Sequence, residues 1–599
     1  MFRVFSIPVR FFIALLIYFS WGPLAGGVVT APVPEFSSPA LIPYPSKVVR
    51  GAGEAGFRSV HVKVGPDVPG RDDLMREIKD IFRTSGIQGS LNSGGAAEGA
   101  MTWELFPDAR MKGEGYDLSV GLGKATVRAG SFGGFFNALQ TLRQLVFNRE
   151  GEFAMPVVRI SDKPAFVLRG IMLDVGRYYM SPALIKEVMR RLSRYKINTL
   201  HLHLTDDPAW RLEVKKYPAL TDGAFHWKSR LPGRFYTQAQ LKDLTDYCAR
   251  LNIQVIPEID MPGHSQPFAR AMKTGMQTEK GVSILKDVVD EAVSLFPGRF
   301  FHMGSDEAHI FMKDFIPRMA EHIRGKGKEV VVWSPGGPHD KDSVLMCWGE
   351  NEAGARMDKN MKRIDSNGFY IDWADSQSGV YQVFFQQPCE VPQGDDKALG
   401  AIMPVWCDGN LSSERRVLEQ YPFYPCALTF AERVWRGSAT KRRDYMAQLP
   451  PRGTDGWKEF REFEQRLAFH RDHFFQGVPF AYVKQADVAW SLVGPFDHRG
   501  KNDTSFEPER RIAPSYRDGD RILAWKKTPV YGAAVHVRHL FAMFNMHRNQ
   551  YRTDHWPTLM SREVGKEDGT CYALTFIRSP REQEAVSYTH LTLPTNSLV

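Results

Sequence analysis

The stretch Phe301–His309, FHMGSDEAH, runs from an apolar segment into two adjacent acids, Asp306 and Glu307. Successive residues of a strand point to opposite faces, so both acids can serve one site only if the strand ends or bulges here. Gly304 permits such a bend. Crowding raises the proton affinity of one carboxyl group, so we expect Glu307 to hold a proton while Asp306 stays ionised. This arrangement suits acid-catalysed cleavage of an acetal; for the pair alone, the alternative is a solvated loop.

The chain around this stretch alternates apolar, strand-like runs with longer helix-like segments, from residue 166 to about 435. Such alternation is typical of an α/β fold, a (β/α)8 TIM barrel, and we assign the barrel to residues 165–440. Its active site is expected where the strands end. The candidate strands are 168–175, 199–204, 254–259, 300–304, 329–333, 344–348, 368–371 and 401–406.

Polar residues follow the first three predicted strands. Arg177 follows the first strand, where its guanidinium fork could hold vicinal hydroxyls of a sugar or form a structural ion pair. Asp206 ends the second strand, and His264 follows the third. With Asp206 to orient it and Glu307 to contact, His264 can belong to an Asp-His-Glu relay that assists proton movement.

Aromatic residues mark the ends of the later strands. Three tryptophans close predicted strands five, six and eight: Trp333, Trp348 and Trp406. Tryptophans at three separate strand ends indicate an aromatic pocket for an apolar or sugar face, although a single one would more often be core. Tyr370 and Asp372 end strand seven, and Asp372 and Asp408 could bind sugar hydroxyls.

Residues 1–27 have the layout of a cleaved signal peptide. Arg3 and Arg10 precede the apolar run Phe11–Phe19, and a small-residue stretch follows. The alternative is an uncleaved membrane anchor, but the apolar run is short for a membrane span. We therefore expect an exported protein, periplasmic or extracellular, without an integral membrane span.

The remaining regions are assigned from their patterns. We expect a small α+β domain over 40–160, a helical connector over 441–480 and an accessory β-sandwich-like region over 481–585. Residues 586–599 resemble a translated sequencing adapter, so the native end of the sandwich would be missing.

Composition excludes several classes of function. Of the 599 residues, 43% are hydrophobic and 24% charged, as in ordinary globular proteins. The net charge of +9 is dispersed rather than gathered into basic runs, which argues against a nucleic-acid partner. The six cysteines show neither metal-ligand spacing nor the density of a disulfide scaffold, and their pairing stays open.

The segment from Arg169 to Trp435 resembles the catalytic barrel of glycoside hydrolase family 20, the β-N-acetylhexosaminidases. The region before it is similar to the small α+β domain that precedes such barrels. The motifs that carry the resemblance are Asp174–Tyr179, His201–Asp207, Pro257–His264, Gly304–Glu307, Tyr370–Asp372 and Ala431–Trp435.

The resemblance implies a substrate-assisted retaining mechanism without a cofactor or metal. Glu307 would protonate the leaving oxygen and later activate water. The 2-acetamido oxygen of the substrate would attack its own anomeric carbon to give an oxazolinium intermediate. Asp306 would accept the acetamide N–H, and Tyr370 would donate to the acetamide oxygen.

The resemblance also implies roles for the other site residues. The three tryptophans would enclose the acetamide methyl group and stack on the ring. Arg177, Asp372 and Asp408 would hold ring hydroxyls, while Asp206 and His264 would support Glu307. Two positions depart from the family pattern: Ser305 stands where glycine is frequent, and Asp408 where glutamate is expected. The shorter Asp408 leaves the preference between gluco and galacto sugars open.

Three alternatives remain at this point. One is a catalytically silent glycan-binding protein on a hydrolase scaffold. Another is a barrel glycosidase with a conventional carboxylate nucleophile. The third is a metal site formed by His201, His203 and His264, of which the first two share a strand face. The partner would be an oligosaccharide or glycoconjugate with terminal N-acetylhexosamine; linkage, aglycone and oligomeric state stay open.

Overall fold

The computed structural model describes residues 11–17, 39–92, 97–149, 152–349, 357–371, 378–409, 411–438, 449–482, 484–485, 489–501, 503–531 and 569–577. The chain divides into two compact units. One unit comprises Phe36–Arg442 with Gln465–Tyr482, and the other comprises Met1–Glu35, Arg443–Glu464 and Val483–Val599.

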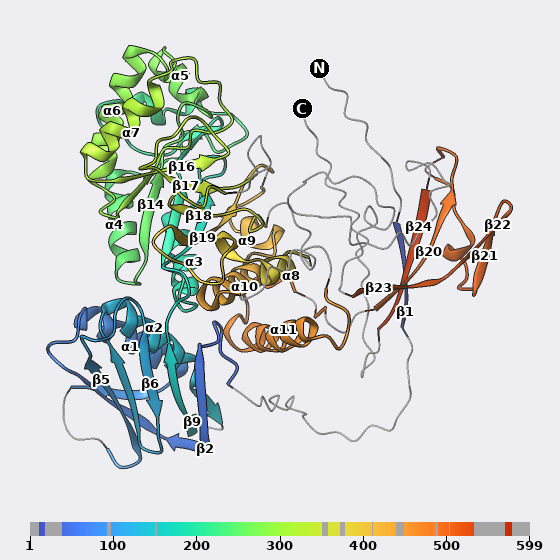
Figure 1. Cartoon of the computed structure of the whole chain (residues 1–599), viewed down its shortest axis with the longest axis horizontal. Coiled ribbons are helices and arrows are strands. Elements are labelled where there is room, and N and C mark those ends of the chain that lie inside the picture. The colour runs from blue at the N-terminus through green and yellow to red at the C-terminus, as the bar shows by residue number, and fades with distance from the viewer. Residues whose placement is uncertain are drawn as a thin grey trace. The chain divides into compact units, whose positions relative to one another are not determined.

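The predicted α+β domain forms one mixed sheet covered by two helices. The sheet order is β2-β9-β6-β7-β5-β3-β4, and β8 pairs with β9. The strands are β2 (Lys47–Phe57), β3 (Ser59–Val64), β4 (Gln88–Leu91), β5 (Ala100–Pro107), β6 (Tyr116–Val120), β7 (Lys124–Ala129), β8 (Phe147–Arg149) and β9 (Glu152–Asp162). The helices α1 (Arg71–Ser85) and α2 (Phe132–Leu145) lie between this sheet and the barrel (Figure 1).

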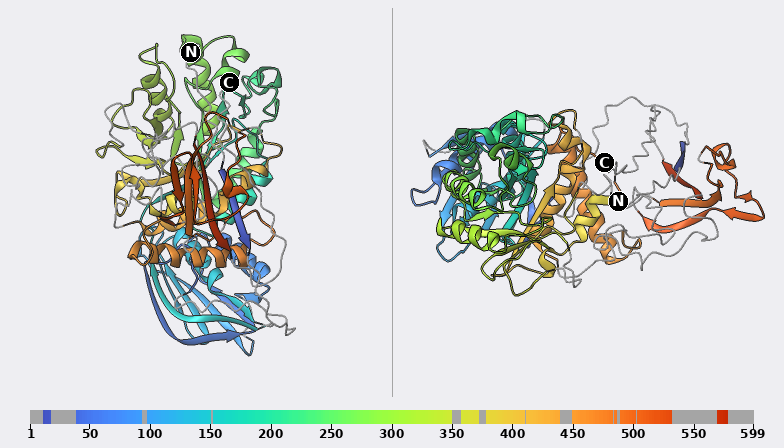
Figure 2. Two further views of the ribbon diagram at one scale, coloured as in Figure 1. Left: turned by 90° about the vertical axis from the view of Figure 1, so that its right-hand side faces the viewer. Right: turned by 90° about the horizontal axis from the view of Figure 1, so that it is seen from above.

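Buried charges join this domain to the barrel. Glu77 of α1 pairs with Arg143 of α2 at 2.8 Å and with Arg190 of the first barrel helix at 2.5 Å. Because Glu77 is 3% exposed, the loss of either arginine would leave a buried charge short of a partner. Figure 2, left, shows the N-terminal sheet, in blue and cyan, at one end of the barrel.

Eight parallel strands close the predicted barrel. They are β10 (Leu168–Asp174), β11 (Thr199–His203), β14 (Gln254–Glu258), β15 (Phe300–His302), β16 (Glu329–Ser334), β17 (Val344–Cys347), β18 (Arg363–Asp365) and β19 (Ala398–Val405). The surrounding helices are α3 (Pro182–Ser193), α4 (Gln238–Ala249), α5 (Gln266–Met272), α6 (Glu279–Val293), α7 (Phe315–Gly325), α8 (Ser378–Phe385), α9 (Arg416–Gln420) and α10 (Phe423–Arg436). A short hairpin, β12 (Thr205–Asp206) with β13 (Ala209–Trp210), follows β11.

The seventh strand was predicted at the wrong place. It lies at Arg363–Asp365, whereas the apolar run predicted as that strand, 368–371, follows it as a loop. Ile364 packs into the barrel core and pairs in register with Met346 of β17. Gly368 has a φ of +82°, which strand backbone does not adopt, so the chain turns there. Tyr370 is therefore supplied by a loop.

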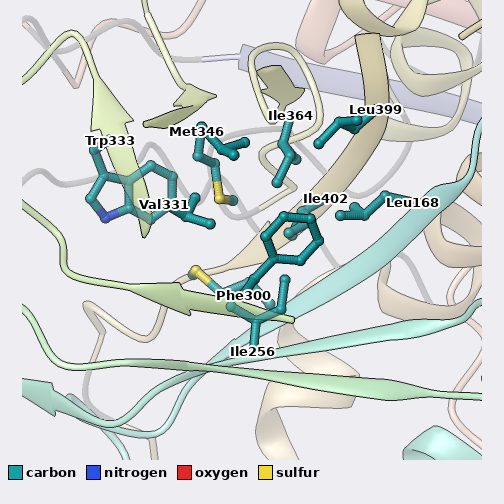
Figure 3. Packing of buried hydrophobic residues seen from close by; sticks show 11 residues of the cluster. Leu168, Ile256, Phe300, Val331, Trp333, Met346, Ile364, Leu399 and Ile402 are labelled. Carbon is teal, nitrogen blue, oxygen red and sulfur yellow. The ribbon is translucent and has the colours of Figure 1, made fainter. Parts of the chain in front are cut away.

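Apolar side chains from the barrel strands fill the interior. Figure 3 shows members of this cluster, among them Phe300 and Ile402, pointing toward one another. Trp333 lies at the edge of this cluster, and Trp348 and Trp406 pack against it from outside. The barrel is thus a filled core, and ligand can approach only at its rim.

The second unit contains the C-terminal strands. A four-stranded sheet has the order β1-β24-β20-β23, from β1 (Phe11–Ile17), β20 (Ala489–Asp497), β23 (Lys526–Tyr531) and β24 (Gly569–Ile577). The hairpin β21 (Ser515–Asp518) and β22 (Arg521–Ala524) packs beside β20. The β-sandwich stays a prediction, since 532–568 lie outside the described residues, as does the 586–599 tail. The apolar run assigned to the signal peptide forms β1, which pairs with β24 in parallel.

The predicted connector contains α11 (Asp455–Phe474). Its second half packs on the barrel unit, where Arg466 pairs with Glu432 of α10 at 2.9 Å and both side chains are buried. All six cysteines are buried. None of the helices described here combines the length and the apolar character needed to cross a bilayer.

Candidate active site

The chain turns sharply after β15, as predicted from Gly304. Gly304, Ser305 and Glu307 have φ values of +67°, +85° and +49°. A Cβ on Gly304 would lie 1.8 Å from Oδ1 of Asp260, so only glycine fits. The two non-glycine residues carry the backbone strain of the left-handed region. This turn brings Asp306 and Glu307 to the same end of the barrel.

Asp206, His264 and Glu307 form the predicted relay geometry. Nε2 of His264 lies 3.3 Å from Oε2 of Glu307, and its Nδ1 lies 3.5 Å from Oδ1 of Asp206. His264 has a φ of +45°, a second strained position at this rim. Asp206 is 2% exposed whereas Glu307 is 59% exposed, so the relay runs from the buried barrel end to the solvent.

The protonation states of the acid pair are the reverse of the prediction in this unliganded structure. Burial, reinforced by the charges of Asp260 and Glu258, raises the pKa of Asp306 to about 8. The hydrogen bond from His264 lowers the pKa of Glu307. Although burial opposes its charge, the bonds to Asp206 and Glu307 raise the pKa of His264 to about 12. At neutral pH the proton of the pair therefore lies on Asp306, beside an imidazolium–carboxylate pair.

Arg177 connects Asp206 of the relay with the acids at the ends of β10 and β19. Its guanidinium pairs with Asp174, Asp206 and Asp408, each at 3.1 Å, and lies 4.8 Å above the ring of Trp406. Burial disfavours its charge, but these three carboxylates raise its pKa. Asp408 is 64% exposed, so the arginine holds one carboxylate toward the solvent for a ligand.

The aromatic residues occupy different depths. Trp333 is 2% exposed and its Nε1 donates to Glu258 Oε1 at 2.7 Å, so it forms the floor of the site rather than an open wall. The ring of Trp406 is tilted against those of Trp333 and Tyr370, with centroid distances of 5.8 Å and 6.4 Å. Trp348 donates to Pro335 O and borders the entrance. Asp372 lies outside the described residues.

The three histidines proposed as a metal site do not converge. Glu258 is instead a hub: His203 Nδ1 lies 2.7 Å from one carboxylate oxygen, which also faces His201 Nε2 at 2.8 Å. The other oxygen accepts the indole N–H of Trp333. Because an indole nitrogen can only donate, this oxygen is engaged by hydrogen, and the arrangement favours a hydrogen-bonded core over chelation.

A cavity of about 520 Å³ opens beside Glu307. Its lining consists of Glu307, Ala308, His309, Pro335, Gly336, Gly337 and Trp348. The glycines bring backbone close to the acid: Gly337 N donates to Ser305 O at 2.5 Å, and a Cβ on Gly336 would meet Trp333 O at 2.4 Å. Glu307 is thus open to a ligand on the side away from His264.

Sequence reasoning missed two groups of residues. The contacts of Glu258 with His201, His203 and Trp333 were not predicted. The alternation of His201 and His203 was the one available signal that this strand face is polar. Arg211 and Arg230, which bind backbone carbonyls around the rim, stand in a long segment between β13 and α4 with no recognisable motif. Only the fold brings their carbonyl partners together.

Comparisons with known proteins match both parts of the barrel unit. The family profile "Glycosyl hydrolase family 20, catalytic domain" matches residues 166–283, and "Glycosyl hydrolase family 20, domain 2" matches 38–163. A beta-hexosaminidase of Porphyromonas gingivalis is 31% identical over 408 residues, 55% of this chain and 52% of that protein. The chain thus spans about half the length of that relative.

Two further relatives match over most of their length. A beta-N-acetylhexosaminidase of Cellulomonas fimi is 30% identical over 454 residues, 67% of this chain and 86% of that protein. The solved GH20 beta-N-acetylhexosaminidase of Streptomyces coelicolor has a TM-score of 0.62 at 25% identity, covering 74% of this chain and 97% of that one. Barrel, rim acids and preceding domain define a TIM-barrel protein of the glycoside hydrolase class. The chain belongs to glycosyl hydrolase family 20.

Proposed function

We propose that the protein is an exo-acting β-N-acetylhexosaminidase that removes terminal β-linked N-acetylglucosamine or N-acetylgalactosamine from oligosaccharides or glycoconjugates. The observation that carries the proposal is the Asp206-His264-Glu307 chain beside the partly buried Asp306. The relatives with this fold bear the names of hexosaminidases. Catalysis would be substrate-assisted, with retention through an oxazolinium intermediate.

Substrate binding would exchange the protonation states of the acid pair. The acetamide N–H of the sugar would donate to Asp306, which favours the ionised form of that carboxyl group. The sugar would also displace water from the half-open Glu307 and raise its proton affinity. The proton then lies where the leaving oxygen needs it, and Asp306 carries the charge that stabilises the acetamide as its oxygen attacks.

Glu307 would act first as acid and then as base. After it protonates the leaving oxygen, its carboxylate faces the imidazolium of His264, which Asp206 holds in place. In the second half, the same carboxylate would take a proton from the water that opens the oxazolinium ring. The cavity beside Glu307 leaves room for the leaving group and for this water.

The remaining side chains would bind the sugar. Tyr370 and the tryptophans would enclose the acetamide, with Trp333 as the floor and Trp348 and Trp406 at the sides. Arg177 and Asp408 would hold ring hydroxyls at the opposite rim, and Asp372 would assist them. None of these steps needs a cofactor or a metal.

We also propose export through a signal peptide cleaved near residue 27. The layout of residues 1–27 supports this proposal. Cleavage would remove β1 from the sheet of the second unit. Sequencing the amino terminus of the secreted protein tests it, because retention of Met1 would contradict cleavage.

The activity is tested with the nitrophenyl β-glycoside of N-acetylglucosamine and its 2-hydroxy counterpart, using wild type and Glu307→Gln. We expect turnover of the acetamido substrate alone, and a loss of about 10²–10⁴-fold in the variant. Turnover of both substrates would favour a conventional carboxylate nucleophile. A folded wild type that cleaves neither would favour a silent glycan-binding scaffold.

A further inference from the structure

Arg230 clasps the turn that carries Asp408. This arginine lies between β13 and α4, is 8% exposed, and points its guanidinium at consecutive carbonyls of the turn after β19. It donates to Cys407 O at 2.9 Å, to Gly409 O at 2.8 Å and also to Asp408 O. One planar group thus binds three consecutive carbonyls of the turn.

A second arginine fastens the segment that carries Arg230. Arg211 is fully buried and donates to Val175 O at 3.1 Å, to Leu231 O and Arg234 O at 2.8 Å each, and to Arg230 O at 2.6 Å. Val175 directly follows β10 and lies two residues before Arg177. Arg211 therefore ties the Arg230 segment to the same strand end that supplies Arg177.

These contacts close a ring around one rim of the barrel. Asp408 completes the ring, because its carboxylate pairs with Arg177 Nε at 3.1 Å, next to the end of β10. The turn is also held from below, where Cys407 N donates to Asp174 Oδ2 at 3.1 Å. The Asp408 side chain is 64% exposed, so its position in the site depends on its backbone and on Arg177 rather than on packing.

We propose that Arg230 is a positioning residue that fixes Asp408. It thereby determines how strongly the site discriminates between terminal sugars that differ in their ring hydroxyls. An aspartate reaches one methylene less far than a glutamate, so the backbone of its turn must be placed to bring the carboxylate to a hydroxyl. Three bonds from one buried guanidinium supply that placement. The inference rests on the proposed function, because it assigns the ligand of Asp408 as a sugar hydroxyl.

The test uses Arg230→Met, with Arg234→Met as the matched control. Arg234 lies in the same segment and is exposed, with only its carbonyl in the ring. Binding of free N-acetylglucosamine and N-acetylgalactosamine, which differ at the 4-hydroxyl, is measured by calorimetry, and the nitrophenyl glycosides give KM and kcat. We expect Arg230→Met to weaken binding about 10-fold, as the loss of a charged hydrogen bond does, and to shrink the preference between the two sugars. KM should carry most of the effect, and Arg234→Met should behave as wild type.

Coupling to Asp408 distinguishes positioning from a general structural effect. In an Asp408→Asn background, Arg230→Met should add less than about a twofold further loss, because both changes remove the same contact. Full additivity of the two losses would overturn the proposal, as would a fall in kcat with unchanged KM and sugar preference.

A third variant covers the case in which Arg230→Met does not fold, as judged by thermal melting. Arg230→Lys retains the charge but cannot span three carbonyls, so it should fold and show a smaller loss of the same kind. A folded Arg230→Lys with wild-type sugar preference would overturn the proposal. The calorimetric comparison does not need turnover. A wild type that binds the sugars but cleaves neither substrate would contradict the proposed activity, and the binding data would still test the role of Arg230.

Discussion

The two rims of the barrel mouth are built on opposite principles. At the ends of β14 and β15, His264, Ser305 and Glu307 adopt left-handed backbone, and Asp306 is a partly buried carboxyl group with a raised pKa. At the ends of β10 and β19, the charges of Arg177, Asp174 and Asp408 are paired. Two buried arginines, Arg211 and Arg230, donate to backbone carbonyls there. Under the proposed function, the first rim holds backbone strain where protons would move, and the second rim is fixed where sugar hydroxyls would bind.

The largest effect is expected from Gly304→Ala. The added Cβ would overlap Asp260 and displace the turn that carries both acids, and a misplacement of about 1 Å costs on the order of 100-fold in rate. The control is Gly327→Ala, which has a similar φ of +78° but no atom within 4 Å of the new Cβ. Steady-state kinetics should show a severe loss in the first variant only. Equal activities would mean that the acids do not depend on this turn.

The pH dependence of kcat/KM reports on the strained rim. Asp306 holds a proton in the free enzyme, and this proton leaves as the pH rises through about 8. We therefore expect an alkaline limb near that pH. In Asp306→Asn the remaining acid is Glu307, whose pKa is lowered by His264, so residual activity should fall off at lower pH. An unmoved limb would show that the limb does not arise from Asp306.

The same substitution should stabilise the fold. The folded pKa of Asp306, about 8, lies above its ordinary value of 3.8, so the folded state binds more protons between these limits and loses stability as the pH rises through them. Asp306→Asn removes this cost, and at pH 8 we expect a gain of about 2–5 kcal/mol, which in a unit of this size is a Tm rise of about 2–5 °C. At pH 4 the gain should nearly vanish. Exposed Asp67→Asn is the control; a gain that is equal at both pH values would contradict the assignment.

The smallest effect is expected from Ser305→Gly. Ser305 is buried with a φ of +85°, so glycine should relieve about 1 kcal/mol of backbone strain and raise Tm by about 1 °C. Its Oγ has no hydrogen-bond partner among the described residues, so Ser305→Ala separates the two contributions by removing the hydroxyl and keeping the Cβ. A gain in the alanine variant equal to that in the glycine variant would show that the strain costs nothing.

The barrel and most of its site could be predicted because their signals are local. Strand-like runs locate seven of the eight strands, and Gly304 and the acids after it mark the functional end. Strand seven failed because Arg363-Ile364-Asp365 has one apolar residue between two charges, whereas the loop after it reads as an apolar strand. Burial of Arg363 and Asp365 inside the barrel is a tertiary effect that no local pattern reveals.

The protonation states and the arginine ring could not be predicted, because they depend on distant neighbours. Asp260 and Glu258 raise the pKa of Asp306 from a different strand. Arg230 acts on a turn that is 177 to 179 residues away in the chain. Trp333 resembles a pocket wall in sequence, but its depth depends on the hydrogen bond to Glu258.

The central claim is that the substrate supplies the nucleophile. It is tested most directly by the rates for nitrophenyl β-glycosides of glucosamine whose N-acetyl group carries zero, one, two or three fluorines. Each fluorine withdraws electrons from the acyl oxygen, so substrate-assisted attack predicts that kcat/KM of wild type falls steeply along the series. Rates that stay level while the leaving group is unchanged would contradict the account, because the nucleophile would then be a group of the protein.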